Sequence, residues 1–177
     1  MAFGGTILYS DSTNRPIFAA IDEPTGNPVF GTRPAPDIWG TITIHFEDGD
    51  DLDILGYWTE TGSGGGVGWA HAASIGGGGM FAFWGGDNTS GGPETIRVGG
   101  EEGHEYHGLH TFRIHFNWYR TGEGHSGGGA HVVATGKNGT QGDAWGGASH
   151  RQSSAANTGD PYVDVVYDSF GLLVSVG

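Results

Sequence analysis

Residues 41–47 read Thr-Ile-Thr-Ile-His-Phe-Glu, an alternation of apolar and polar side chains that is typical of a half-buried β-strand. In such a strand the isoleucines and Phe46 lie on one face, and His45 lies on the other. Residues 111–119 show the same alternation. Glycine interrupts nearly every stretch long enough for a helix, at a cost of about 1 kcal/mol per glycine. These patterns predict an all-β protein.

The composition supports a folded chain. Glycine accounts for 37 of the 177 residues, yet the chain also contains 6 Trp, 6 Tyr and 9 Phe. A disordered chain would lack these aromatic side chains, and collagen would need glycine at every third position. Short aromatic strands joined by glycine-rich turns explain both observations. We therefore predict one soluble domain over residues 1–177, a β-sandwich or a jelly-roll-like fold.

Several short strings of residues recur in the same order at similar separations. They are Ile-His-Phe (44–46 and 114–116), Ser-Gly-Gly-Gly (63–66 and 126–129), Ala-His (70–71 and 130–131) and Trp-Gly-Gly (84–86 and 145–147). This order predicts an internal duplication related by a pseudo-twofold axis. An N-terminal segment (1–38) would precede copy one (39–103) and copy two (104–177). Alternatively, similar strand-and-turn chemistry produces similar strings without common descent.

The charge balance excludes some classes of partner. The formal net charge is −13, from 7 Lys and Arg against 20 Asp and Glu. Seven scattered cations cannot form the basic face that nucleic acids or anionic membranes require. The chain has no cysteine, and we expect neither a signal peptide nor a membrane-spanning stretch. We expect a cytoplasmic protein, one released without a signal peptide, or a virion component.

The acidic segment 47–53 is a candidate cation site. It contains five carboxylates, and Asp48, Asp50 and Asp51 are its candidate ligands. Ca²⁺ prefers oxygen ligands of this kind, although the spacing differs from that of an EF-hand loop. The alternative interpretation is a hairpin turn, because Asp-Gly commonly joins two antiparallel strands.

A second candidate metal site lies in a histidine-rich segment. His104, His107 and His110 recur at every third residue, with carboxylates between and before them. Three imidazoles could hold a transition metal such as zinc, nickel or non-haem iron. The alternative is a polar loop that connects the two copies.

The two Trp-Gly-Gly loops are candidate ligand sites. Glycine lets a loop approach a ligand closely, and an exposed indole stacks on the apolar face of a sugar ring. The alternative is that both tryptophans end core strands and hold the loops in place. The candidate residues are Trp84, Asp87 and Asn88 in copy one, Asp143 and Trp145 in copy two, and the corresponding histidines His71 and His131.

No nucleophile motif and no pair of isolated acids marks a catalytic site. We therefore predict a non-catalytic, lectin-like module that binds a glycan or another small polar ligand at two related sites. A structural or self-assembling protein, such as a virion or decoration subunit, fits the composition equally well and would form a homo-oligomer. The third alternative is a metal-dependent enzyme that uses the histidine-rich segment.

Overall fold

The chain divides into two units, Met1–Ala35 and Pro36–Gly177. In the first unit β1 (Thr6–Ser10), β2 (Pro16–Ile21) and β3 (Pro28–Gly31) form an antiparallel sheet in the order β1-β2-β3. No helix of the length and apolar character needed to cross a bilayer occurs in the described part of the chain. The computed structural model describes residues 6–10, 16–21, 28–31, 36–46, 50–62, 66–77, 79–89, 91–121 and 128–177.

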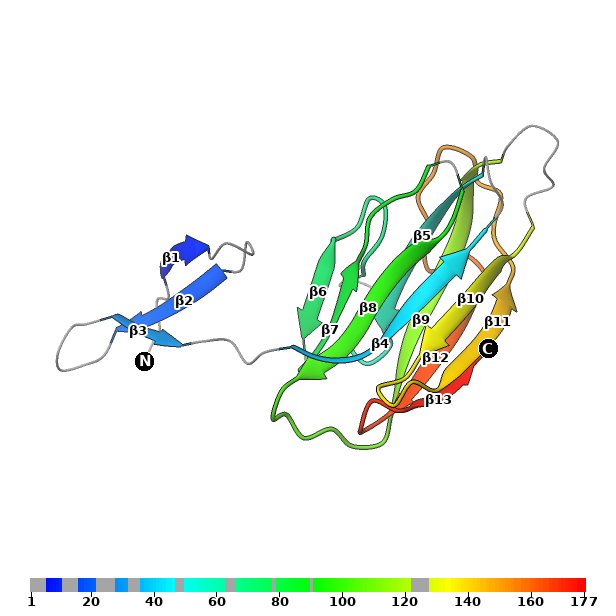
Figure 1. Ribbon diagram of the computed structural model, residues 1–177. Coiled ribbons are helices and arrows are strands. Elements are labelled where there is room, and N and C mark those ends of the chain that lie inside the picture. The colour runs from blue at the N-terminus through cyan, green and yellow to red at the C-terminus, as the bar shows by residue number, and fades with distance from the viewer. Residues whose placement is uncertain are drawn as a thin grey trace. The chain divides into compact units, whose positions relative to one another are not determined.

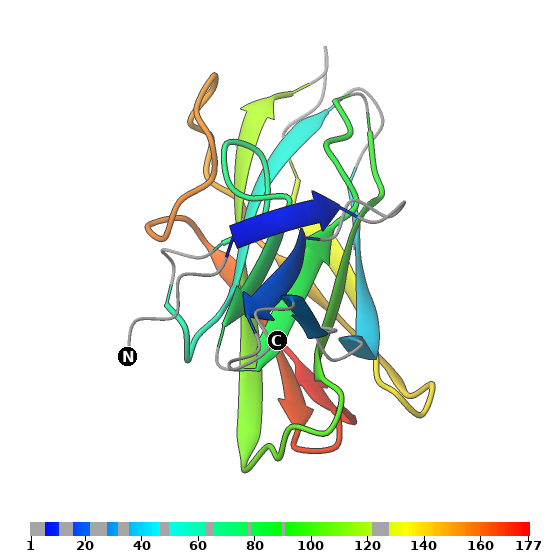
Figure 2. The same cartoon turned by 90° about the vertical axis from the view of Figure 1, so that its left-hand side faces the viewer.

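The second unit is a sandwich of two antiparallel sheets (Figures 1 and 2). One sheet has the order β11-β10-β4-β8-β7-β6 and the other the order β13-β12-β9-β5. This arrangement confirms the predicted all-β sandwich. The first sheet comprises β4 (Pro36–His45), β6 (Ser74–Gly77), β7 (Met80–Trp84), β8 (Glu94–Glu101), β10 (Ala130–Thr135) and β11 (Gln141–Gly146). The second comprises β5 (Asp51–Trp58), β9 (Leu109–Arg120), β12 (Tyr162–Asp168) and β13 (Leu173–Val176).

Alternating side chains from both sheets fill the space between them. On β4, Ile42 and Ile44 are fully buried, whereas His45 is exposed, as the alternation in residues 41–47 predicts. Burial of each large apolar side chain stabilises the fold by about 1.5–3 kcal/mol. The largest fully buried side chains are Trp39, Trp58, Trp118, Tyr167, Phe112 and Phe116.

One end of the sandwich, which we call the loop end, holds the last residues of four strands and the first residues of the strands that follow them (Figure 1, top). The strands that end there are β4, β7, β9 and β11, and those that begin there are β5, β8, β10 and β12. The opposite end holds the first residues of β4 and the β10–β11 connection. There the ammonium group of Lys137 lies 2.6 Å from a carboxylate oxygen of Asp37. Because β4 runs from one end to the other, its last residues reach the loop end.

The strands that carry the recurring strings are only partly equivalent. The Ile-His-Phe strands β4 and β9 pair with β8 and β12, which in each case follow the Trp-Gly-Gly loop of the same copy. By contrast, β7 pairs with β8, whereas β11 pairs with β10. His45 is exposed and His115 is buried. The internal duplication stays a prediction, as do its boundaries, the first of which falls within β4.

Candidate functional site

Three ring-bearing side chains form a row across the outer face of the six-stranded sheet. In the strand registers, His131 on β10 lies opposite His45 on β4 and also opposite Trp145 on β11. The neighbours of all three along their strands face inward, so the three rings leave the sheet on the side away from the core. The ring centroids of His131 and Trp145 are 4.7 Å apart with an interplanar angle of 15°, a stacked arrangement. The His45 and His131 centroids are 6.0 Å apart.

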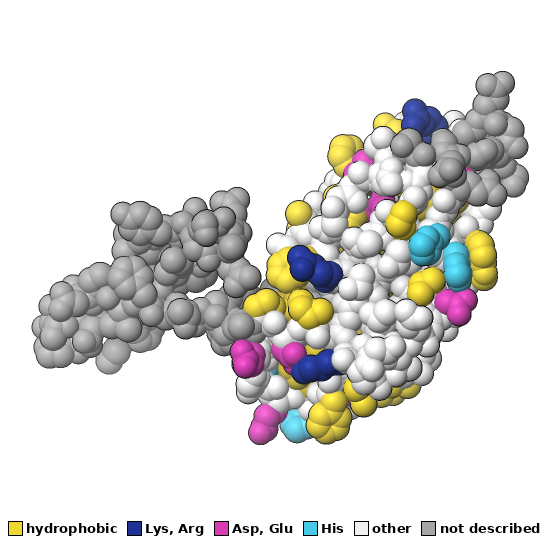
Figure 3. Space-filling view, in the orientation of Figure 1, with side chains coloured by type: hydrophobic (Ala, Val, Ile, Leu, Met, Phe, Trp, Pro, Cys, Tyr) yellow, Lys and Arg dark blue, Asp and Glu magenta, His cyan; other side chains and the backbone are white. Residues whose placement is uncertain are grey.

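Asp143 holds this row in place. Its Oδ2 lies 2.9 Å from Nε2 of His131, and the two residues come from neighbouring strands. This contact fixes the orientation of the imidazole, which in turn covers one face of the indole. Trp145 is nevertheless 72% exposed, so its other face is open to solvent. In Figure 3, histidine side chains lie beside hydrophobic and acidic ones over β4, β10 and β11.

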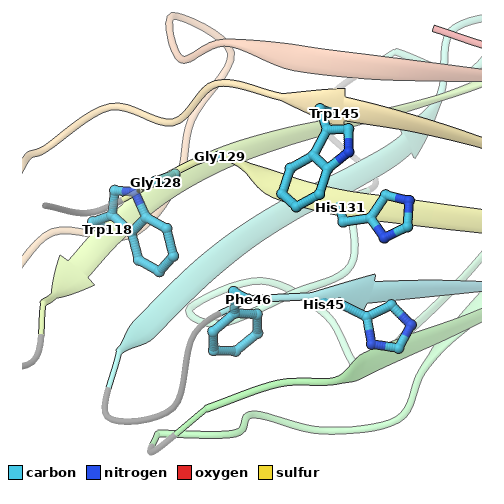
Figure 4. A pocket seen from close by; sticks show the side chains of 7 residues that line it. All are labelled: His45, Phe46, Trp118, Gly128, Gly129, His131 and Trp145. Atoms are coloured by element: carbon cyan, nitrogen blue, oxygen red, sulfur yellow. Dashed lines mark hydrogen bonds between the residues drawn. The ribbon is translucent and has the colours of Figure 1, made fainter. Parts of the chain in front are cut away.

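An open depression of about 250 Å³ adjoins the row (Figure 4). Phe46 and Trp118 provide its apolar wall, and their ring planes meet at 74°. Trp118 is almost fully buried, and its indole N–H donates a hydrogen bond to the Gly128 carbonyl oxygen at 2.9 Å. The depression therefore has an apolar wall that is anchored in the core, and Trp145 lies at its other side. Its lining residues are His45, Phe46, Trp118, Gly128, Gly129, His131 and Trp145.

Two adjacent glycines in this lining differ in the space around them. A Cβ atom on Gly129 would lie 2.3 Å from the Gly146 carbonyl oxygen, whereas one on Gly128 would meet nothing within 4 Å. We expect Gly129→Ala to lower the free energy of unfolding by about 1–3 kcal/mol, because two backbone segments must separate. Gly128→Ala is the matched control and should stay near the wild-type value in urea unfolding. Equal effects of the two substitutions would contradict this description of the lining.

Trp84, the counterpart of Trp145 in copy one, has a different environment. It is half-buried against the core, and its indole N–H donates to Oε2 of Glu94 at 2.9 Å. The Asn88 backbone N–H donates to the other oxygen of the same carboxylate. Trp84 therefore holds the β7–β8 loop in place, and the two Trp-Gly-Gly loops do not form equivalent exposed platforms.

Asp87 in that loop joins the acidic segment. Carboxylate oxygens of Asp51, Asp53 and Asp87 all lie within 4.8 Å of one another. Burial raises the pKa of Asp53 to about 7, and the charges of Asp51 and Asp87 act in the same direction. Burial likewise raises the pKa of Glu94 to about 8, against the opposing effect of its hydrogen bond from Trp84. Unlike charged carboxylates in water, these groups hold protons near neutral pH.

The other two predicted ligands of the acidic segment are Asp48 and Asp50, and neither belongs to this cluster as the structure describes it. Asp50 is fully buried and does not belong to the three-carboxylate group, and Asp48 lies outside the described residues. Asp53 was not among the predicted ligands, although it lies in the same acidic segment. Its position two residues after Asp51 on one strand places both on the same face, a signal that the sequence did contain.

The histidine-rich segment does not assemble into a ligand group. His104 is exposed with its ring centroid 4.6 Å from that of Tyr106, and His107 is also exposed. His110 is buried at the start of β9, where its ring centroid lies 5.6 Å from that of Trp39. Among the described residues, the carboxylates above are the one group of three close metal-ligating side chains.

His71 also lies outside the row. It is exposed, and its Nε2 donates a hydrogen bond to the Ala156 carbonyl oxygen at 3.1 Å. Of the predicted sugar-site residues, the structure brings together Trp145, Asp143 and His131. It adds Phe46, Trp118 and the glycines, whose contribution depends on a strand register that no local sequence pattern indicates.

No family model matches this chain, and no curated protein or solved structure matches it either. Its chemistry is therefore inferred from the geometry of its own residues.

Proposed function

We propose that the protein is a non-catalytic carbohydrate-binding module whose ligand rests on Trp145 beside the depression at the loop end. The observation that carries this proposal is the 72% exposure of Trp145 together with its stacking on His131. A singly exposed aromatic side chain is ordinary on a protein surface. An exposed indole whose orientation is fixed by a stacked and hydrogen-bonded neighbour is suited to binding a ligand with little loss of entropy.

The polar groups around the indole fit a sugar. The apolar C–H face of a pyranose stacks on the free face of Trp145, as it does on exposed aromatic rings generally. The exposed Asp143 carboxylate can accept hydrogen bonds from sugar hydroxyl groups, and the exposed His45 ring offers a further donor or acceptor. Gly128 and Gly129 leave room for the ring to approach the backbone.

The charge of the chain favours neutral sugars. The formal net charge of the chain is −13, and the carboxylate of Asp143 lies beside the row, 2.9 Å from His131. Both repel sialic acids, uronic acids and sulfated sugars. The different environment of Trp84 favours one site per chain, in place of the two related sites expected from the repeated Trp-Gly-Gly string.

The test is a glycan array followed by calorimetric titration of the best neutral oligosaccharide into the full chain. Trp145→Ala should abolish binding and change the free energy of unfolding by no more than about 0.5 kcal/mol, because the side chain is mostly exposed. Trp69→Ala is the matched control, since Trp69 is also exposed (47%) but does not line the depression. It should bind like the wild type.

The proposal fails if no glycan binds above background. It also fails if Trp145→Ala binds as well as Trp69→Ala. A stoichiometry of two sugars per chain would overturn the assignment to a single site.

A further inference from the structure

We propose that Asp51, Asp53 and Asp87 form a Ca²⁺ site at the loop end. The site is independent of the proposed sugar site, because none of its residues lines the depression beside Trp145. Its ligands come from two separate segments, the start of β5 and the β7–β8 loop. A bound ion would therefore join segments that are distant in the sequence.

The separation of the carboxylate oxygens fits a single calcium ion. Ca²⁺ binds oxygen ligands at about 2.3–2.6 Å, so two of its ligands can be up to about 5 Å apart. The oxygens of the three carboxylates lie within 4.8 Å of one another, inside this limit. Mg²⁺ requires shorter bonds of about 2.0–2.1 Å in a stricter octahedral geometry. The all-oxygen ligand set also disfavours zinc and copper, which prefer nitrogen or sulfur ligands.

Asp53 provides a second, separate reason to expect a ligand. The residue is only 2% exposed, and its Oδ2 atom has no hydrogen-bond partner among the described residues. A buried polar atom without a partner is costly, and a buried carboxylate is more so. The same carboxylate faces the oxygens of Asp51 and Asp87. A cation coordinated there would satisfy the orphaned atom.

The neighbouring charges leave the cluster electronegative. Arg120 lies opposite Asp51 in the β5–β9 register, and its charge partly offsets that of Asp51. The Arg120 guanidinium donates to the Thr89 carbonyl oxygen at 2.7 Å, so it is also engaged with the β7–β8 loop. Glu94 adds a further acid beside Asp87. Binding of a divalent ion would favour the charged forms of these acids, so Asp53 and Glu94 would release the protons that they hold near neutral pH.

The three carboxylates differ in their exposure to solvent. Asp51 and Asp53 are buried, whereas Asp87 is exposed on its loop. An ion can therefore enter from the Asp87 side, and water molecules can supply the remaining ligands of the six to eight that Ca²⁺ takes.

The test uses the full chain, stripped with EDTA, dialysed and titrated with CaCl₂ in a calorimeter, with thermal unfolding measured in parallel. We expect saturable binding of one ion per chain and an unfolding temperature that rises with Ca²⁺ concentration. MgCl₂ should bind at least about tenfold more weakly. Absence of both saturable heat and a thermal shift at about 5 mM Ca²⁺, above the dissociation constants of most weak calcium sites, would overturn the proposal.

Two variants and a matched control assign the ligands. Asp53→Asn and Asp87→Asn should each weaken Ca²⁺ binding by about tenfold or more, because each removes one charged ligand. In EDTA, Asp53→Asn should unfold no earlier than the wild type, since it removes a buried ionisable group. Glu102→Gln, at an exposed carboxylate beyond the other end of β8, should bind Ca²⁺ like the wild type.

Asp87 is exposed, so Asp87→Asn tests the site even if Asp53→Asn fails to fold. Unchanged Ca²⁺ affinity in Asp87→Asn would overturn the assignment of these ligands. Equal affinity for Mg²⁺ and Ca²⁺ would overturn the choice of ion.

Discussion

In EDTA, Glu94→Gln is expected to be more stable than the wild type at about pH 9 and nearly equal to it at about pH 4, with a difference at high pH on the order of 5 kcal/mol. Glu94 is 2% exposed, and burial raises its pKa from 4.5 in the unfolded chain to about 8 in the fold. Between these two values the folded state holds a proton that the unfolded state has lost. Stability therefore falls as the pH rises from about 4.5 to 8, and the loss is complete above the folded pKa.

Glutamine removes this loss because it does not ionise. It also keeps an amide oxygen that can accept the hydrogen bond from the Trp84 indole. Urea unfolding at a series of pH values measures the effect, with Glu102→Gln as the control for removal of an exposed carboxylate. Parallel pH profiles for Glu94→Gln and the wild type would contradict the burial of an ionisable group at this position.

Trp118→Ala is expected to lower the free energy of unfolding by about 3–5 kcal/mol and to abolish sugar binding. The side chain is 1% exposed, packs against Phe46, and donates a hydrogen bond to the Gly128 carbonyl oxygen. Its removal leaves a cavity in the wall of the depression and releases the segment that contains the lining glycines. Urea unfolding measures the loss of stability, and titration with the bound sugar measures the loss of affinity.

Trp118→Phe separates the two roles of this residue. Phenylalanine fills most of the volume but cannot donate the hydrogen bond, so the stability loss should be smaller than for alanine. If Trp118→Ala is no less stable than Trp145→Ala, then the contrast between a core tryptophan and an exposed one is incorrect.

Local alternation was sufficient to predict the main strands. Residues 41–45 of the first pattern lie in β4, residues 111–119 of the second lie in β9, and His45 faces away from the core as expected. Alternation succeeds here because one face of each sheet packs on the other sheet. Residues 36–40 extend β4 beyond the recognisable pattern, since a proline and a glycine there interrupt the alternation.

The site could not be predicted as a whole because it depends on strand neighbours. Trp84 and Trp145 have the same Trp-Gly-Gly context, yet Trp84 contacts Glu94 and Trp145 lies on the edge strand β11. The row of His45, His131 and Trp145 exists only because β10 lies between β4 and β11. Likewise, Asp87 joins the acidic segment from a separate loop.

The Lys137–Asp37 ion pair at the end opposite the loop end has a practical consequence. Lys137 is the single lysine of the chain, so its ε-amine is the only side-chain amine that an acylating reagent can modify. It lies near the start of β4, and that ten-residue strand separates it from His45 by roughly 30 Å. A dye, a bead or a sensor surface coupled through Lys137 would therefore leave Trp145 and the acidic cluster facing the solution.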